Sequence, residues 1–247
     1  MVKKKDLKKL LNLNFVDLTN QTYSCGKYDL PYFRCPSNIN IDYLALYSEV
    51  KNYNKTENTC VCFYQYDIEF DSIKGVFNAI YYNDEKLLAK YKERFKAIKY
   101  AIAPDYSQLG DIPRVENLYR LFKARIVSIW LVLECDVLVI PNITYANENY
   151  FDVMLDGMEE TEVVAFSAKG SMREADEREL FLKAIKITVD GLPNLKKIIV
   201  YSVSIDDEKV LKLFEYASLK GIEIVIPDNI LKERNVVNKE VKSNGQK

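Results

Sequence analysis

Histidine is absent from this chain of 247 residues. A Ser-His-Asp or Cys-His mechanism within one chain is therefore excluded, and so are zinc sites built on histidine. Any acid or base chemistry must use Asp, Glu, Lys, Tyr or Cys side chains whose pKa is tuned by their surroundings. Glycine and proline are scarce as well, at eight and seven residues, and no Pro/Gly linker, repeat or low-complexity tract divides the chain.

Long apolar runs are also missing. No stretch of 18 apolar residues occurs, so the sequence contains no candidate membrane span. The first residues, "MVKKKDLKKLLNLNF", have the lysines of a signal peptide, but Asn12 and Asn14 interrupt the apolar stretch and no A-x-A-like cleavage site follows. We therefore expect a cytoplasmic protein without a membrane partner.

Neither sign of charge dominates, because the sequence contains 35 Lys and Arg residues and 36 Asp and Glu residues. The formal net charge of -1 argues against a protein held to nucleic acid by bulk charge, and leaves a local patch open. The five cysteines are an odd number at irregular spacing, and in the cytosol we expect reduced thiols. Cys60 and Cys62 alternate along an expected strand, so we interpret them as small buried residues on one face rather than as metal or redox groups.

Six short apolar runs recur along the chain, each followed by a polar turn. The last five begin 25 to 38 residues apart, which suits strand-crossover-strand units rather than hairpins. The runs are almost continuously apolar, as expected for strands that are covered on both faces. They are "TCVCFYQY" (59–66), "IKYAIA" (98–103), "DVLVIP" (136–141), "EVVAFS" (162–167), "KIIVYS" (197–202) and "IEIVIP" (222–227).

The segments between these runs have helical periodicity. Apolar residues recur at every third or fourth position in three of them: 84–96, 112–134 and 206–219. Asp111 is the expected N-cap of the second helix, with Pro113 in its first turn, and Gly221 ends the third. The sequence thus predicts an α/β fold with a mostly parallel sheet of about six strands and crossover helices.

The chain is expected to have three parts. Residues 1–58 are an irregular, aromatic N-terminal extension that packs on the core. Residues 59–230 are the α/β core domain. Residues 231–247 are a polar C-terminal tail with a frayed end.

Polar residues follow five of the expected strands. In parallel α/β sheets, ligands bind at the carboxyl ends of the strands, and these ends lie on one side of the sheet. The candidate ligand-binding side chains there include Ser107, Asn142 and Ser167. The alternative is that strand ends simply carry turn-forming residues. The polar ends are "PDYS" (104–107), "PNITY" (141–145), "SAKGS" (167–171), "YSVS" (201–204) and "PDN" (227–229).

The stretch "VVAFSAKGSMREADEREL" (163–180) runs from an apolar strand through a small loop into a charged helix. It lacks both the G-x-G-x-x-G fingerprint and the P-loop pattern. Ser171 followed by Glu174 forms an S-x-x-E capping box, which accounts for the start of the helix. Lys169, Gly170 and Ser171 are also placed to bind an anion at the helix N-terminus, so the loop has a structural and a ligand-binding interpretation.

Asp105 is the candidate catalytic residue. It follows an apolar strand, and a carboxylate that is partly desolvated at a strand end has a raised pKa and can act as an acid or a base. The alternative is that Asp105 accepts hydrogen bonds from the backbone of its own turn. We expect Asn142 and Ser167 on neighbouring strand ends, because sequential crossover units place successive strands side by side.

Two further features concern charged residues. Asp152 and Asp156 lie four residues apart in "YFDVMLDGM", where paired carboxylates hold a divalent metal if the segment is helical. The Asp156-Gly157 pair is more typical of a helix end or turn, so we predict no metal site. Arg125 falls among apolar residues, which favours a buried ion pair with a carboxylate, and it is also a candidate ligand-binding residue.

Several of these motifs occur in an order that resembles an uncharacterised family of bacterial, plasmid and phage proteins, a domain of unknown function. The resemblance covers roughly residues 60–204 and implies an α/β domain that is frequent on mobile elements. It carries no established reaction or cofactor, but it draws attention to the residues within the motifs, among them Ser107, Asn142 and Asp156. The motifs are "APDYS", "DIP" before the helix that contains Arg125, "VLVIPNI", "YFDVMLDGM", "VVAFSAKG" and "ELFLKAI".

Two functions from different classes remain open. The first is a mobile-element protein that binds a phosphorylated or nucleotide-like ligand at the strand ends, with catalysis left open. The second is a protein-binding factor without chemistry, such as an inhibitor of a host defence complex or a replication accessory protein. The 18 tyrosines suit a contact surface. An open pocket at the strand ends favours the first function, and an exposed apolar patch elsewhere favours the second.

Overall fold

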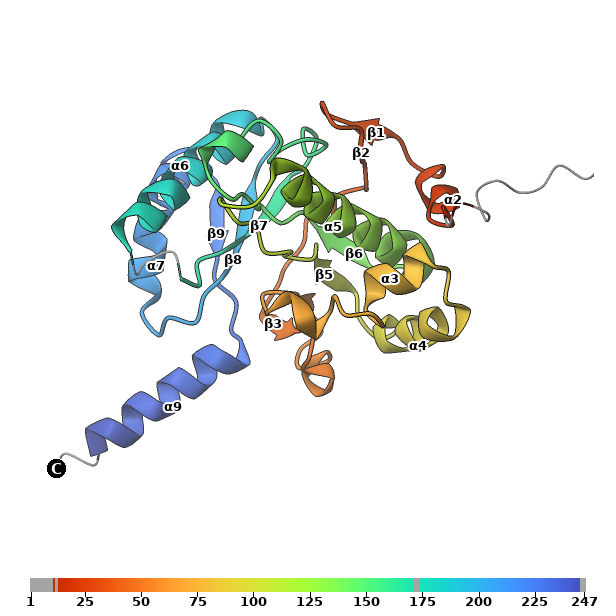
Figure 1. The fold of residues 1–247 in the computed structure, drawn as a ribbon. Helices are drawn as coiled ribbons and strands as arrows, with labels where there is room; N and C mark the ends of the chain where they lie inside the picture. The colour runs from red at the N-terminus through yellow and green to blue at the C-terminus, as the bar shows by residue number, and fades with distance from the viewer. Residues whose placement is uncertain (1–10, 12, 171–173, 245–247) are drawn as a thin grey trace, which may run out of the picture.

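The computed structural model describes residues 11, 13–170 and 174–244, and the side chains of that range up to residue 239. Its centre is built from parallel strands with helices around them (Figure 1). Four strands form one parallel sheet in the order β3 (Tyr43–Leu46), β4 (Thr59–Cys62), β5 (Tyr100–Ile102) and β6 (Leu138–Ile140). Three form a second parallel sheet in the order β7 (Val163–Ser167), β8 (Lys197–Tyr201) and β9 (Glu223–Val225).

The predicted α/β class and parallel strands are confirmed, but the predicted sheet of about six strands is not a single one. Each of the six apolar runs contains a strand, and each sheet has fewer than six strands. The seventh parallel strand, β3, lies within the extension 1–58, for which no regular strand is predicted. Its sequence, "YLAL", is only four residues long and has no flanking helical segment to mark it as part of a crossover unit.

Isolated parallel bridges connect the two sheets at both of their edges. Beyond β6, the Ile143 amide donates to the Ala165 carbonyl at 2.9 Å, next to the pairing of Asn142 with Ala165. Beyond β9, the Leu44 amide donates to the Asp228 carbonyl at 2.8 Å. Backbone hydrogen bonds therefore continue around a closed ring of seven parallel strands, and all the carboxyl ends open at one mouth.

Side-chain alternation agrees with this ring, because every strand sends residues into a single inner cluster. Cys60 and Cys62 both lie in it and are fully buried, which confirms their predicted place on one face of a strand. The intervening residues, such as Val61 and Val164, face outward into two separate clusters beneath the helices. The inner cluster includes Leu44, Leu46, Cys60, Cys62, Tyr100, Ile102, Ile140, Val163, Ala165, Ile199, Tyr201 and, partly buried, Val225.

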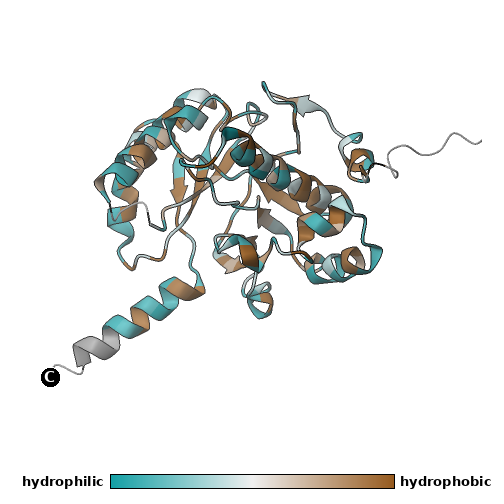
Figure 2. Ribbon diagram, in the orientation of Figure 1, coloured by the Kyte–Doolittle hydropathy of each residue, from teal (hydrophilic) through white to brown (hydrophobic). Residues whose placement is uncertain are grey.

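Helices cover the outside of the ring in two groups, and Figure 2 shows hydrophobic residues concentrated on the strands that they enclose. The four-stranded sheet packs against α3 (Val76–Tyr81), α4 (Glu85–Phe95) and α5 (Arg114–Cys135). The three-stranded sheet packs against α6 (Ala175–Gly191), α7 (Asp207–Leu213) and α8 (Glu215–Leu219). The single helix predicted over 206–219 is thus divided at Phe214.

Aspartate side chains cap two of the helices, but the N-cap predicted for α5 is wrong. The Asp84 carboxylate accepts from the Leu87 amide at 3.0 Å and caps α4, and the Asp206 carboxylate accepts from the Lys209 amide at 3.3 Å and caps α7. Asp111 is not the N-cap of α5. Pro113 holds that position and the helix begins directly after it.

The two ends of the described chain differ. The N-terminal part contains α2 (Val16–Thr19) and an antiparallel pair, β1 (Ser24–Cys25) with β2 (Leu30–Pro31). It reaches the core through contacts such as Phe15 against Phe122, with ring centroids 5.5 Å apart. The C-terminal segment, predicted to be a frayed tail, instead forms α9 (Ile230–Asn244), which projects from the rest of the protein (Figure 1).

Short helical turns complete the fold: η1 (Val50–Asn52), η2 (Asp67–Glu69) and η3 (Glu148–Tyr150). Within the described ranges, no helix combines the length and the apolar character needed to cross a membrane.

Candidate functional site

A polar cleft opens at the mouth of the strand ring. It has two lobes, of about 380 Å³ and 450 Å³, that share the same central residues. These come from the ends of β5 and β7, which the ring brings together across β6. The shared residues are Asp105, Ser107, Ser167, Lys169 and Gly170. The structure therefore gathers five of the predicted site residues at one place.

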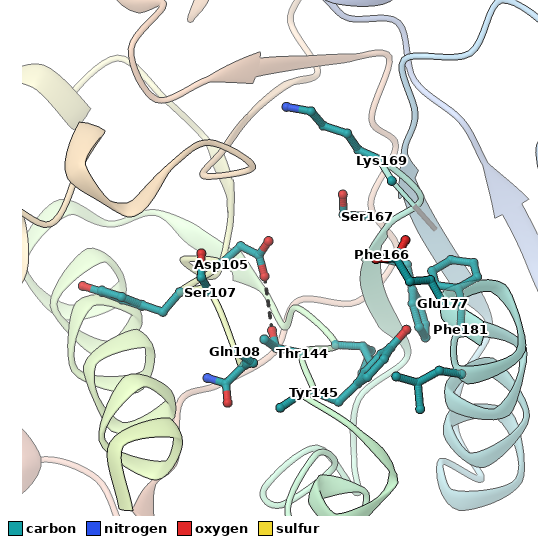
Figure 3. Close-up of a pocket in the computed structure, with 15 residues that line it drawn as sticks. Asp105, Ser107, Gln108, Thr144, Tyr145, Phe166, Ser167, Lys169, Glu177 and Phe181 are labelled. Atoms are coloured by element: carbon teal, nitrogen blue, oxygen red, sulfur yellow. Dashed lines mark hydrogen bonds between the residues drawn. The ribbon is translucent and has the colours of Figure 1, made fainter. Parts of the chain in front are cut away.

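Both lobes combine polar and apolar side chains. Apolar residues that include Ile143, Tyr145 and Phe181 line the first lobe, together with Gln108 and Glu177 (Figure 3). The second lobe is lined by Leu46, Tyr64, Gln65, Tyr66 and Glu69. Figure 3 shows Asp105 and Ser107 on one side of the first lobe and Phe166, Glu177 and Phe181 on the other.

Asp105 is held through one of its two oxygens. The Asn142 amide donates to Asp105 Oδ1 at 2.8 Å, and the Thr144 hydroxyl lies 3.4 Å from the same atom. The amide of Asn142 is itself oriented by the Tyr64 hydroxyl, which donates to Asn142 Oδ1 at 2.7 Å. In the part of the chain that the structure describes, no hydrogen bond is made to Asp105 Oδ2, so this oxygen is available to a ligand.

Burial sets the acidity of Asp105. Desolvation is the main cause that raises the pKa of its carboxyl from 3.8 to about 6, and the negative charge of Asp67 adds to it. The hydrogen bonds from Asn142 and Thr144 act in the opposite direction. Both protonation states of Asp105 are consequently populated close to neutral pH, as an acid/base group requires.

Ser107 is tied to a partner that the sequence does not reveal. Its amide and hydroxyl donate to Asp67 Oδ1 at 3.1 Å and 2.9 Å, and Asp67 also pairs with Arg120 at 2.7 Å. Asp67 lies on η2, far from Ser107 in the chain, and no local pattern links the two. The hydroxyl proton of Ser107 is engaged, so this serine can offer a ligand its lone pairs.

The loop after β7 supplies the only described cation that lines the cleft, Lys169. Gly170 has a φ of +97°, a conformation that residues other than glycine rarely adopt. Ser171 lies outside the described residues. Helix α6 begins at Ala175 and Glu174 is its N-cap, so Glu174 is not at the third helical position that the predicted capping box requires.

Arg125 does not reach the cleft. It is buried, and its Nη2 atom donates to the backbone carbonyl of Asp156 at 2.5 Å, rather than to a carboxylate as the sequence predicts. Desolvation lowers the pKa of this guanidinium and also raises the pKa of the Asp156 carboxyl. Arg125 and Asn142 instead border a separate cavity of about 30 Å³.

The carboxylates considered for a metal, Asp152 and Asp156, do not line the cleft. Asp152 pairs with Arg114 at 2.7 Å, which accounts for its position. Across the described residues, no group of three or more His, Cys, Asp or Glu side chains is placed to hold a metal ion.

The family described as Domain of unknown function (DUF4417) matches residues 22–217. This chain belongs to that family. The match confirms the resemblance found in the motifs and extends beyond the range 60–204 on both sides. It includes the strands β3 to β8 and the residues of both cleft lobes, whereas β9 and α9 follow it.

The relatives of this DUF4417 protein include phage proteins. The Gene 1 protein of Mycobacterium phage L5 is 24% identical over 169 residues, which are 68% of this chain and 68% of that protein. The Gene 1 protein of Mycobacterium phage D29 is 25% identical over 114 residues, or 46% of this chain and 40% of that protein. No solved structure matches the chain.

Proposed function

We propose that this DUF4417 protein binds a small polar ligand of nucleotide type in the cleft and exchanges a proton with it through Asp105. The observation that carries the proposal is the position of Asp105. It stands where the two lobes meet, it is fixed through Oδ1, and its pKa lies at about 6. A carboxyl group with one fixed oxygen and one free oxygen can present its proton in a defined direction.

The neighbours of Asp105 have supporting roles in this proposal. Ser107 and Ser167 offer hydroxyl groups to the ligand, and Lys169 offers a positive charge to one phosphate or to another anionic group. Asn142 positions the carboxyl group of Asp105, and Tyr64 positions Asn142, without taking part in the chemistry.

The test measures proton exchange on binding. Nucleosides and nucleoside monophosphates are first screened by thermal shift. The binding enthalpy of any ligand found is then measured by calorimetry near pH 6 in buffers of different ionisation enthalpy. We expect wild-type protein to exchange up to about half a proton per ligand, because Asp105 is about half ionised there. The Asp105→Asn variant should bind a nucleoside with no net proton exchange, and a monophosphate with only the exchange of its own phosphate group, whose second pKa is about 6.

The matched control is Asp111→Asn, which removes an exposed carboxylate from a residue that does not line the cleft. Its proton exchange should equal that of wild type. An equal proton count in Asp105→Asn and wild type, or the absence of binding by every compound screened, would contradict the proposed function.

A second candidate function is a protein-binding factor, such as an inhibitor of a host defence complex or a replication accessory protein. The observation in its favour is the segment beside the second lobe, where Tyr66, Ile68 and Ile73 are 84%, 76% and 91% exposed. Exposed apolar side chains grouped on one segment are typical of contact surfaces. One double substitution distinguishes the two candidates. Changing Ile68 and Ile73 to serine should abolish binding of a protein partner and leave binding of a cleft ligand unchanged.

A further inference from the structure

We infer that the ligand is a two-part molecule of nucleoside type, in which a planar ring occupies the first lobe and a hydroxyl-bearing group occupies the second. The inference rests on the proposed function, because it names the class of ligand for the same cleft. Asp105 then lies beside the bond that joins the two parts, since it belongs to both lobes.

The first lobe is suited to a planar ring. Phe166 and Phe181 pack edge to face with centroids 5.7 Å apart, and with Tyr145 they give the lobe a fixed apolar wall. One exposed acceptor lies in the same lobe. Glu177 is an exposed carboxylate, whereas Gln108 Oε1 is buried and the Gln108 amide donates to the Asn117 carbonyl at 3.3 Å.

The carboxylate of Glu177 points to the chemistry of the ring. A carboxylate has only acceptor atoms, and a ligand N–H group would bond to it. The edge of the ring beside Glu177 therefore donates, as the amino and ring N–H groups of nucleobases do.

The second lobe is suited to hydroxyl groups. Gln65 is already committed, since it bonds to Ser48 through both its oxygen and its nitrogen. Glu69 is exposed and its carboxylate makes no hydrogen bond to the described chain, so its two oxygens can accept from neighbouring hydroxyls, as on a sugar. Tyr66 forms the rim of the lobe and adds an exposed ring.

Charge limits the number of phosphates. Lys169 is the sole cationic side chain in the described lining of the two lobes, against Glu69, Asp105 and Glu177. A nucleoside or a monophosphate is compatible with this balance, whereas a triphosphate would meet net repulsion.

The test separates the two lobes with two carboxylate variants and two ligands. Adenosine, guanosine, cytidine and uridine are compared by calorimetry. The nucleoside that binds most tightly is then paired with its base methylated at the glycosidic nitrogen, which lacks the sugar. Glu177→Gln should weaken both ligands by about tenfold, the value of a charged hydrogen bond. Glu69→Gln should weaken the nucleoside by a similar factor and leave the methylated base unchanged.

Glu57→Gln is the control, because Glu57 is exposed and precedes β4, at the opposite end of the ring from the mouth. It should change neither affinity. The inference is overturned if the methylated base binds as tightly as the nucleoside, if Glu69→Gln weakens both ligands equally, or if the nucleoside triphosphate binds more tightly than the nucleoside. It is also overturned if another compound shows Asp105-dependent proton exchange and no nucleoside binds. In that case the proposed function stands. The proposed function falls if no compound binds at all, or if Asp105→Asn and wild type exchange equal numbers of protons.

Discussion

At the scale of single residues, the environment of Asp105 opposes the stability of the fold. Burial keeps its pKa at about 6 in the folded protein, above the ordinary value of 3.8 that applies to the unfolded chain. The unfolded chain therefore gives up this proton more readily, and ionisation favours unfolding. A carboxyl group retained at such a cost is typical of a functional site rather than of a structural contact.

This cost predicts a stabilising substitution. As pH rises from about 4 to about 6, the contribution of Asp105 to the free energy of unfolding should decrease, and above that range it should stay constant. Asp105→Asn cannot ionise and keeps a similar shape, so above pH 6 it should be more stable than wild type, by up to about 3 kcal/mol. Urea denaturation at pH 4 and pH 7 measures the difference. An equal difference at both pH values, or the same gain in Asp111→Asn, would contradict the explanation.

At the scale of secondary-structure elements, local sequence predicts much of what forms. The continuous apolar runs specify six of the seven ring strands, and the period of three to four residues specifies α4, α5 and the α7–α8 region. Boundaries are less predictable. The run 59–66 gives a strand only to Cys62, because the pairing of β4 with β3 ends at Leu46 and Cys62 and its pairing with β5 ends at Val61 and Ala101.

Part of the site was predictable because its residues follow strands that the apolar runs specify. Asp105, Asn142 and Ser167 follow predicted strands, so parallel pairing brings them to one mouth. Two partners of the site residues were not predictable: Asp67 bonds to Ser107 across 40 positions, and Tyr64 bonds to Asn142 across 78. No spacing rule links residues so far apart. Arg125 was misassigned because a cation among apolar residues indicates burial but not its partner, which is a backbone carbonyl.

The loop after β7 provides a test at this scale. Gly170 and Gly221 both have positive φ, at +97° and +82°, and a Cβ added at either would meet nothing within 4 Å. Each change to alanine should therefore cost about 1–2 kcal/mol through backbone strain alone. Only Gly170→Ala should also weaken nucleoside binding, because it displaces Lys169 at the cleft. Urea denaturation and calorimetry measure the two effects, and equal affinity in both variants would show that the loop has no part in binding.

At the scale of the whole molecule, the ring closes through contacts that no local pattern predicts. Tyr43 pairs with Asp228 near the other end of the chain, and this pairing places β9 beside β3. Without it the inner cluster would be open along one side, between residues such as Leu44 and Val225. Closure also fixes the cleft, since its second lobe is bordered by the ends of β3 and β4.

Closure makes the position of a truncation decisive. A chain that ends at Ala217, near the end of the DUF4417 match, lacks β9 and Asp228 and exposes the apolar inner cluster. A chain that ends at Glu233 keeps both, together with the Lys232–Asp207 ion pair at 2.8 Å, and loses most of α9. We expect the longer chain to unfold cooperatively and to keep its ligand affinity, and the shorter one to show no cooperative transition by circular dichroism and to bind a hydrophobic dye. A sharp transition in the shorter chain would mean that the six remaining strands form a stable core without β9. Closure of the ring would then not be required for a stable fold.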